Sequence, residues 1–204
     1  FNTTTMIDIS YGCMEAVSGS GGKGGYFGDD YSQEITNNEG LPGIGGDGGN
    51  AVLWMYSHDI GVDDVPLVCI AGDGADGGRG PNVGGTGGNG GSAHLTVGSE
   101  TSVYIHAPRF WCLAGNGGDG GSAVGGIQGY GGVGGDAILN VTVEERIWIE
   151  GSDVRADGGS AGEHDGGEGA TVLKLETIEQ STGRPNFFAG NSSFNQQLGR
   201  DVFS

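Results

Sequence analysis

Proline and basic residues are both scarce in this 204-residue chain. Only five prolines accompany 48 glycines, which excludes collagen, because its triple helix needs a strict glycine triplet with abundant proline. Eight Lys and Arg residues, scattered singly, stand against 26 Asp and Glu. Nucleic acid and anionic membranes are bound by clustered basic side chains, so neither is expected as a partner.

Long apolar runs are also missing, so no membrane insertion is expected, and no signal peptide is recognisable. The chain begins at Phe1 without an initiator Met, which suggests a processed protein or a piece of a longer one. Cysteine is limited to Cys13, Cys69 and Cys112, an odd and widely spaced set without metal-ligand spacing. No metal and no cofactor is therefore expected.

Glycine is roughly three times as frequent as in ordinary proteins. The glycine tracts alternate with apolar segments such as residues 137–141 and 147–149, which indicates a buried core. The tracts have two possible states. They either pack side by side as extended polyglycine II helices, hydrogen-bonded to one another, or form disordered loops.

An internal repeat organises the chain. Residues 69–78 recur as 112–121, and shorter copies occur at 154–159 and 14–19. A second motif repeats at 48–53, 90–95 and 134–139, and a third element repeats at 60–62, 103–105 and 147–149. The apolar part keeps a length of about twenty residues, whereas the glycine part varies.

Within the apolar part, three short segments alternate as strands do. Ala93, Leu95 and Val97 are predicted inward with His94 outward, and Val103 and Ile105 inward with Tyr104 outward. Three short strands in about twenty residues predict an all-β parallel β-helix (β-solenoid) of about four coils with glycine-rich excursions. Residues 1–182 would form this repeat domain, with a loop or cap at 26–41, and 183–204 a C-terminal cap or attachment segment.

Two families share these motifs. The Gly-Gly-x-Gly-Gly tracts at 45–49, 87–91 and 131–135 resemble those of T-even-type phage tail-fibre adhesins, which implies a polyglycine II sandwich with receptor-binding loops. The strand segments resemble glycine-rich parallel β-helices of phage fibres and bacterial surface proteins. The tract at 87–93 is also similar to mycobacterial glycine-rich surface proteins. These resemblances imply a structural and adhesive role at a virion or cell surface.

Catalytic and metal sites are not expected. Residues 131–139 match the calcium-binding nonapeptide of repeat-in-toxin proteins, but Asp136 is replaced by Asn50 and Ser92 in the other copies, which favours a plain turn. The paired acids at 29–30, 63–64 and 144–145 lie at positions where neighbours point apart or are solvated. The four histidines, at 58, 94, 106 and 164, fall in different segments without a nucleophile.

Exposed aromatic residues are the candidate binding groups. Tyr104 and Trp148 are predicted outward at the same position of neighbouring repeats, and Trp54 outward one strand earlier, where they either contact sugars or a subunit or are covered as ordinary core. Cys69 and Cys112 are predicted to form a buried column that Met14 and Val154 continue. Glycosylation sequons begin at three asparagines: Asn2, Asn140 and Asn191.

The sequence therefore predicts a non-catalytic structural and adhesive component of a virion tail fibre or other extracellular appendage. Its partners would be a cell-surface glycan or protein receptor, or other fibre subunits, and an oligomer is one of the states that the sequence allows. Two alternatives remain: an ice-binding protein, which a regular Thr face would favour, and a β-helix enzyme that cleaves polysaccharides.

Overall fold

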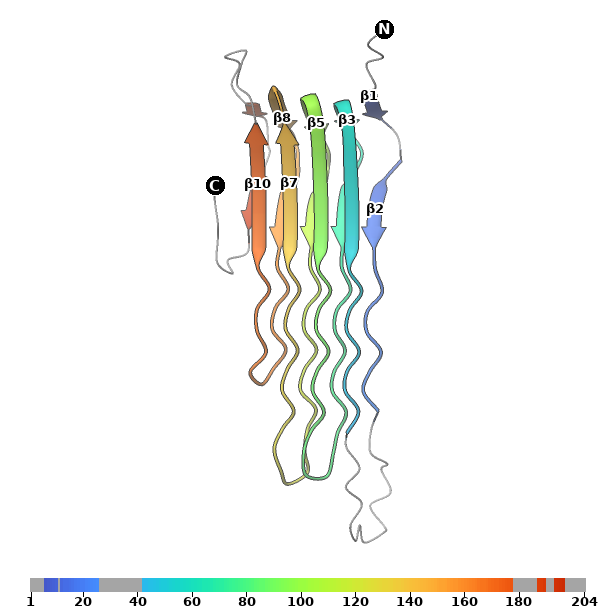
Figure 1. The fold of residues 1–204 in the computed structure, drawn as a ribbon, viewed down its shortest axis with the longest axis vertical. Coiled ribbons are helices and arrows are strands. Elements are labelled where there is room, and N and C mark those ends of the chain that lie inside the picture. The colour runs from blue at the N-terminus through green and yellow to red at the C-terminus, as the bar shows by residue number, and fades with distance from the viewer. Residues whose placement is uncertain (1–5, 11, 26–41, 178–186, 190–192, 197–204) are drawn as a thin grey trace.

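The computed structural model describes residues 6–10, 12–25, 42–177, 187–189 and 193–196. All of its regular elements are β-strands (Figure 1). In chain order they are β1 (Met6–Ile9), β2 (Met14–Val17), β3 (Ala51–Asp63), β4 (Leu67–Ile70), β5 (Ala93–His106), β6 (Phe110–Leu113), β7 (Ala137–Val143), β8 (Arg146–Glu150), β9 (Asp153–Asp157), β10 (Thr171–Thr177), β11 (Phe187–Ala189) and β12 (Ser193–Gln196).

The strands form two sheets. The long sheet has the order β1-β3-β5-β7-β10, with β8 beside β5 and β11 beside β8; the short sheet has the order β12-β9-β6-β4-β2. Every pairing between these strands is parallel, as in α/β proteins, where helices cover both faces of the sheet. In the described part no helix is present, and each sheet covers one face of the other.

The core lies between the two sheets because the strands alternate apolar and polar residues. In β5, Ala93, Leu95 and Val97 are fully buried, whereas His94 is exposed. Phe110 of β6 is the largest of the fully buried side chains. Each buried Leu, Ile or Phe contributes about 1.5–3 kcal/mol relative to an exposed one.

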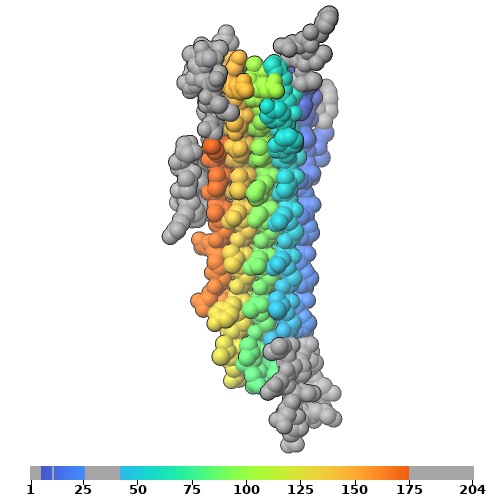
Figure 2. Space-filling view, in the orientation of Figure 1, coloured from blue at the N-terminus to red at the C-terminus, as the bar shows by residue number. Residues whose placement is uncertain are grey.

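Equivalent residues of the repeat lie side by side, as the sequence predicts. Ala51 pairs with Ala93, Ala93 with Ala137, and Val103 with Ile147. The repeat motifs therefore mark true structural neighbours. Figure 2 shows the successive repeats as parallel ridges along the length of the molecule.

The closed parallel β-helix predicted from the sequence is wrong. The segments at 93–97 and 103–105, expected on two faces of a coil, belong to the single strand β5, and β7 and β8 both pair with it in the long sheet. Only the third segment lies in the other sheet. About twenty residues therefore do not close a coil, because the return path of the chain runs through the glycine tracts (Figure 1). A β-bulge between Ser57 and Asp59 shifts the register between β3 and β5, but β3 continues through it.

The cysteine column also differs from its prediction. Cys69 pairs with Cys112, as expected, but the column continues through Ala16 and Ala156, not Met14 and Val154. The predicted register is wrong by two residues. A shift of two residues leaves the same side chains pointing inward, so the alternation of the sequence does not reveal it. Both cysteines are fully buried and carry free thiols.

The glycine tracts continue both sheets. Descending tracts (18–25, 71–80, 114–122 and 158–163) follow the short-sheet strands, and ascending tracts (43–50, 84–92, 129–136 and 166–170) lead into the long-sheet strands (Figure 1). Gly72 donates its N–H to Gly49 at 2.9 Å, and Gly91 donates to Gly72 at 2.8 Å, which bonds the two layers together. Gly74 donates to Asn116 at 2.7 Å within one layer. The side-by-side hydrogen bonding expected of these tracts is therefore present.

Close approach explains why glycine is required. A Cβ placed on Gly72 would overlap the carbonyl oxygen of Gly19, and one on Gly115 would overlap that of Gly72. In the tracts that have neighbours on both sides, most glycines meet a neighbouring backbone in this way, and every third residue, which we call X, points outward. The tracts thus follow a Gly-Gly-X pattern for steric reasons.

The X side chains complete the hydrogen bonding. Asp73 Oδ1 accepts the N–H of Asn116 at 2.7 Å, and Asn116 Oδ1 accepts the N–H of Ser160 at 3.0 Å. Asp47 and Asn89 do the same between ascending tracts. An outward Asp, Asn or Ser at X therefore satisfies a backbone donor of the next repeat, which would otherwise need water.

Two predicted segments fall outside the described residues. They are the loop or cap at 26–41 and the boundary at 182–183 between the repeat domain and the C-terminal cap. Beyond that boundary, β11 pairs with β8 and β12 pairs with β9, which adds one strand to each sheet.

Candidate binding face

The outer face of the long sheet carries an apolar patch on β3. Val52, Trp54 and Tyr56 alternate outward and are 66%, 66% and 53% exposed. The Trp54 and Tyr56 ring centroids are 6.1 Å apart, and their planes are within 11° of parallel. Gly98 of β5 leaves room for the Tyr56 ring, since a Cβ there would lie 2.7 Å from its Cδ2. We call these three side chains the aromatic face.

Tyr104 and Trp148 form a second aromatic group further along the same sheet. They are neighbours in register, with centroids 6.2 Å apart and ring planes at 69°. Glu150 accepts hydrogen bonds from the Tyr104 hydroxyl at 2.8 Å and from Trp148 Nε1 at 3.1 Å. The Arg146 guanidinium lies 4.9 Å from the Trp148 ring centroid. Both aromatics are half-buried, and their polar atoms already have partners within the protein.

The ionisation of Tyr104 reflects this setting. Burial, and then the hydrogen bond to Glu150, raise the pKa of Tyr104 to about 12. The hydroxyl therefore stays protonated across the physiological range and acts as a donor to the carboxylate. It is a structural group of the sheet surface and not a source of a phenolate.

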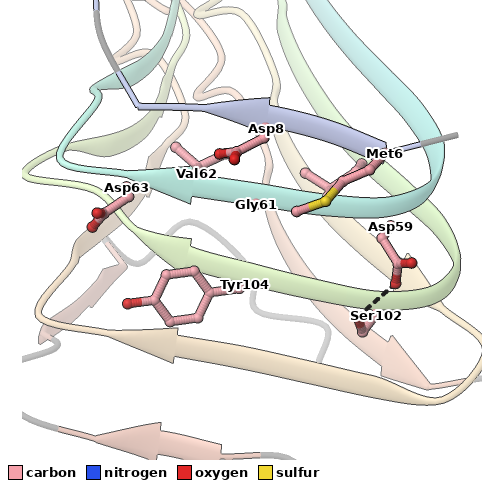
Figure 3. Close-up of a pocket in the computed structure, with 9 residues that line it drawn as sticks. Met6, Asp8, Asp59, Gly61, Val62, Asp63, Ser102 and Tyr104 are labelled. Carbon is pink, nitrogen blue, oxygen red and sulfur yellow. Dashed lines mark hydrogen bonds between the residues drawn. The ribbon is translucent and has the colours of Figure 1, made fainter.

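A groove of about 360 Å³ lies beside Tyr104 (Figure 3). Gly61 lies along the groove, Met6 of β1 supplies an apolar wall, and Asp8, Asp59 and Asp63 make the groove acidic. The carboxylates have partners: Ser102 donates to Asp59 at 2.8 Å, and His106 Nδ1 lies 2.8 Å from Asp63. The groove is thus a shallow acidic surface that suits a neutral or cationic group better than an anion.

The three aromatic residues predicted from the sequence do not form one ladder. Tyr104 and Trp148 lie together, but Trp54 lies on the part of β3 that precedes the bulge, whereas the residue paired with Tyr104 is Gly61. Trp54 instead pairs with Thr96 in register and stacks with Tyr56. Tyr56 was missed, although it stands two residues after Trp54 on the same face of an alternating strand.

A further aromatic residue on the short sheet was also missed. The guanidinium groups of Arg109 and Arg155 lie 4.9 Å and 5.8 Å from the Trp111 ring centroid. Trp111 Nε1 donates to Asp153 at 3.1 Å. The nearby arginines and the carboxylate leave little of this ring available, in contrast to Trp54.

Of the three predicted glycosylation sites, only Asn140 lies within the described residues. Asn140 lies on β7, half-buried on the outer side of the long sheet, where Thr142 Oγ1 donates to its Oδ1 at 3.3 Å. Asn2 and Asn191 lie outside the described residues. Glycosylation at all three stays a prediction.

The residues considered for chemistry are dispersed. Asp136 Oδ1 accepts the N–H of Ala170 at 2.7 Å, so it serves as an X residue. No group of three His, Cys, Asp or Glu side chains suited to a metal ion occurs within the described ranges. His58 Nδ1 lies 3.0 Å from Glu100, and Asp64 lies in a turn with φ 55°. The acid pair at 29–30 is outside the described residues.

Comparison with protein-family models, curated proteins and solved structures gives no match. Among the described residues no helix is long and apolar enough to span a membrane. A role for this chain therefore has to be argued from its own surface, on which the aromatic face is the most exposed apolar feature of the sheets.

Proposed function

We propose that this chain is a non-catalytic structural and adhesive component of a virion tail fibre or similar extracellular appendage, and that its aromatic face binds a cell-surface glycan. The observation that carries the proposal is the exposed Trp54–Tyr56 pair, with nearly parallel rings on a sheet that is fixed from behind by a packed core. Exposed apolar patches of this kind mark interaction sites.

The chemistry favours a neutral glycan. The C–H face of a sugar ring packs on an aromatic plane, and two parallel rings offer places for consecutive sugars. The net charge of −18 opposes acidic polysaccharides, and the acidic groove near Tyr104 adds to this. Binding should therefore depend little on salt, because apolar contacts and not ion pairs hold the ligand.

The elongated shape supports a structural role. The stacked repeats and their glycine tracts form a long, narrow body in which each layer bonds to its neighbours (Figure 2). A body of this kind holds the aromatic face on a rigid support, which limits the entropy lost on binding. The family resemblances of the glycine tracts and strands favour the same role.

The test is binding to a panel of immobilised neutral and acidic surface glycans. Trp54→Ala is expected to weaken binding to a neutral glycan by about tenfold or more while leaving the fold intact, since exposed positions tolerate substitution. Tyr130→Ala is the matched control, because Tyr130 is 61% exposed but lies in an ascending tract away from the aromatic face.

Two results would contradict the proposal. Equal glycan binding by the wild type and Trp54→Ala would remove the aromatic face as the adhesive surface. Release of new reducing ends from any polysaccharide in the panel would show that the chain is an enzyme.

A further inference from the structure

The stack of repeats ends at its N-terminal side in an incomplete repeat. β1 and β2 flank β3 and β4, and the descending tract 18–25 flanks 71–80. No described residue pairs with the open side of 43–57, because β1 covers only Asp59–Val62 of β3. We call the surface formed by 18–25 and 43–57 the end face.

Backbone donors on the end face lack the partners that their equivalents have. In the lattice, the N–H of Asn89 is accepted by Asp47, and that of Ser92 by Asn50, each through the X side chain of the preceding tract. The N–H groups of Asp47 and Asn50 themselves donate to no described residue. In the repeating pattern, these N–H groups would donate to the X side chains of a preceding tract, and no described residue supplies one.

The edge of β3 continues this ladder upward. Ala51 donates its N–H to Ser92 on the β5 side, so the N–H and C=O groups of Val52, Trp54 and Tyr56 point to the opposite, open side. An extended chain lying beside 43–50 could therefore continue as a parallel strand beside Ala51–Ser57. The end face is a template for a chain that changes from glycine tract to strand at the same level as β3.

Three glycines on the end face have no steric reason within the chain. A Cβ on Gly19, Gly22 or Gly25 would meet nothing within 4 Å. At the equivalent positions Gly72 and Gly115, a Cβ would overlap the backbone of the preceding descending tract. Glycine at Gly19 and Gly25 is required only if another glycine-rich chain packs there, whereas the position of Gly22 is occupied by Ala75 in the next repeat.

The opposite end of the stack does not supply that chain. In the ascending tract 166–170, the X residues are Gly167 and Ala170, which offer no side-chain acceptor. Glu168 takes the place of Gly134, at which a Cβ would overlap a carbonyl oxygen of the adjacent descending tract. Head-to-tail stacking of two copies would therefore leave Asp47 and Asn50 unpaired and set Glu168 against the backbone.

We propose that the end face binds a glycine-rich hairpin of a separate polypeptide in the Gly-Gly-X pattern, with Asp, Asn or Ser at X. One leg lies beside 18–25, where glycine permits contact, and the other lies beside 43–50 and continues as a strand along β3. The contacts are those of the lattice within the chain, so the interface continues an arrangement that the molecule already uses. This surface shares β3 with the aromatic face, but it uses the open backbone edge of the strand and not the outward side chains.

The probe is a fluorescent peptide with the sequence of residues 71–97. Inside the protein this segment presents Asn89 and Ser92 as acceptors to the next repeat, the groups that Asp47 and Asn50 lack. We expect saturable binding to the full chain. A peptide with Gly87→Ala and Gly90→Ala is the matched control, since a Cβ at either position would overlap a descending-tract carbonyl.

Two variants of the protein identify the surface. Gly19→Ala is expected to weaken peptide binding about tenfold or more without loss of stability, because its Cβ is open within the chain but blocks the incoming leg. Gly125→Ala is the control: its Cβ is equally open, but it lies in the distal turn of another repeat and should leave binding unchanged.

A chimera tests the fit without the entropy cost of a free peptide. Residues 71–101 are placed directly before Met6, in place of residues 1–5, because Met6 and Ser102 both pair with Asp59 and the register is kept. The unfolding midpoint should rise by about 2–4 °C or more, and Gly19→Ala in the chimera should abolish the rise.

Three outcomes would overturn the proposal. One is peptide binding that Gly19→Ala leaves unchanged. Another is a chimera that gains stability while the peptide shows no binding, which assigns the surface to a covalently attached segment. The third is self-association of the wild-type chain that Gly19→Ala abolishes, which would make the occupant a second copy.

Discussion

The three cysteine side chains differ strongly in their solvent exposure. Cys13 is exposed, whereas Cys69 and Cys112 are fully buried neighbours in the short sheet. Cys112 Sγ also lies 3.2 Å from the carbonyl oxygens of Ala93 and Ile138. Hydrogen bonding to Cys69 and burial raise the pKa of the Cys112 thiol, which disfavours its thiolate.

We therefore expect one fast-reacting thiol per native chain with a disulfide reagent such as DTNB. The other two should react only at the rate at which the protein opens. Cys13→Ser should remove the fast phase and leave the slow one. Fast labelling of the Cys13→Ser variant in native buffer would show that the column between the sheets is accessible.

His58 gives a prediction about pH. The hydrogen bond with Glu100 raises the pKa of His58 above its ordinary 6.5, against a smaller opposing effect of desolvation. Because the folded-state pKa is the higher one, the pair stabilises the fold fully below about pH 6.5 and loses this contribution as pH rises through the folded-state pKa. NMR titration should find a raised pKa for His58 that Glu100→Gln lowers. An unchanged titration in Glu100→Gln would contradict the pairing.

At the scale of the element, the glycine tract is held by contacts that tolerate no side chain. Gly72→Ala places a Cβ against the Gly19 carbonyl oxygen, and we expect a loss of about 1–3 kcal/mol in the free energy of unfolding. Gly125→Ala, with open space around its Cβ, should change stability by less than about 0.5 kcal/mol. Urea denaturation measures both. Equal stability of the two variants would mean that the tracts are not packed as described.

The X ladder is the second device of the tract. Asp73→Ala removes the acceptor of the Asn116 N–H and should cost about 0.5–1.5 kcal/mol, towards the low end because water can replace it. Asp73→Asn keeps the acceptor and removes a negative charge, so its stability should equal or exceed that of the wild type. Denaturation curves of the three proteins decide this. A loss in the Asn variant as large as in the Ala variant would assign the effect to charge and not to hydrogen bonding.

The sequence predicts the neighbours better than it predicts the path of the chain. The repeat places Ala51, Ala93 and Ala137 side by side because stacked repeats must present equivalent residues to one another. It does not reveal that residues 93–106 form one strand, since an alternating pattern is the same whether a strand continues or turns onto a new face. The closed coil was therefore wrong while the inward residues within it were right.

Part of the candidate binding face could be found in the same way. Trp54 was predicted to point outward, and Tyr56, which was missed, could have been found from the alternation of the same strand. The partner of Tyr104 could not be found, because its hydrogen bond to Glu150 joins two different strands, β5 and β8, whereas Trp148 and Glu150 lie two residues apart on β8. The X ladder left a visible signal, a short polar residue after several of the glycine pairs, whose meaning depends on which tract lies next to it.

In a protein whose net charge is −18, the ladder of X side chains also places carboxylates next to one another. Asp76, Asp119 and Glu163 occupy the same X position in neighbouring descending tracts: Asp119 donates its N–H to Asp76, and Glu163 donates to Asp119. Folding thus places these carboxylates on neighbouring tracts, whose backbones lie about 5 Å apart if they are spaced like parallel strands, whereas unfolding separates them. The folded state carries the larger repulsion, and salt screens it.

The unfolding midpoint should therefore rise when NaCl is increased from about 0.01 M to about 0.5 M, at which the screening length falls below the size of the acidic rows. Chloride is the suitable anion, because sulfate also stabilises proteins through exclusion from their surface. Asp119→Asn keeps the acceptor for Glu163 and removes the central charge of its row, so it should raise the midpoint at low salt and reduce the salt dependence. A midpoint that falls with NaCl would mean that attractive ion pairs outweigh the repulsion between the stacked carboxylates.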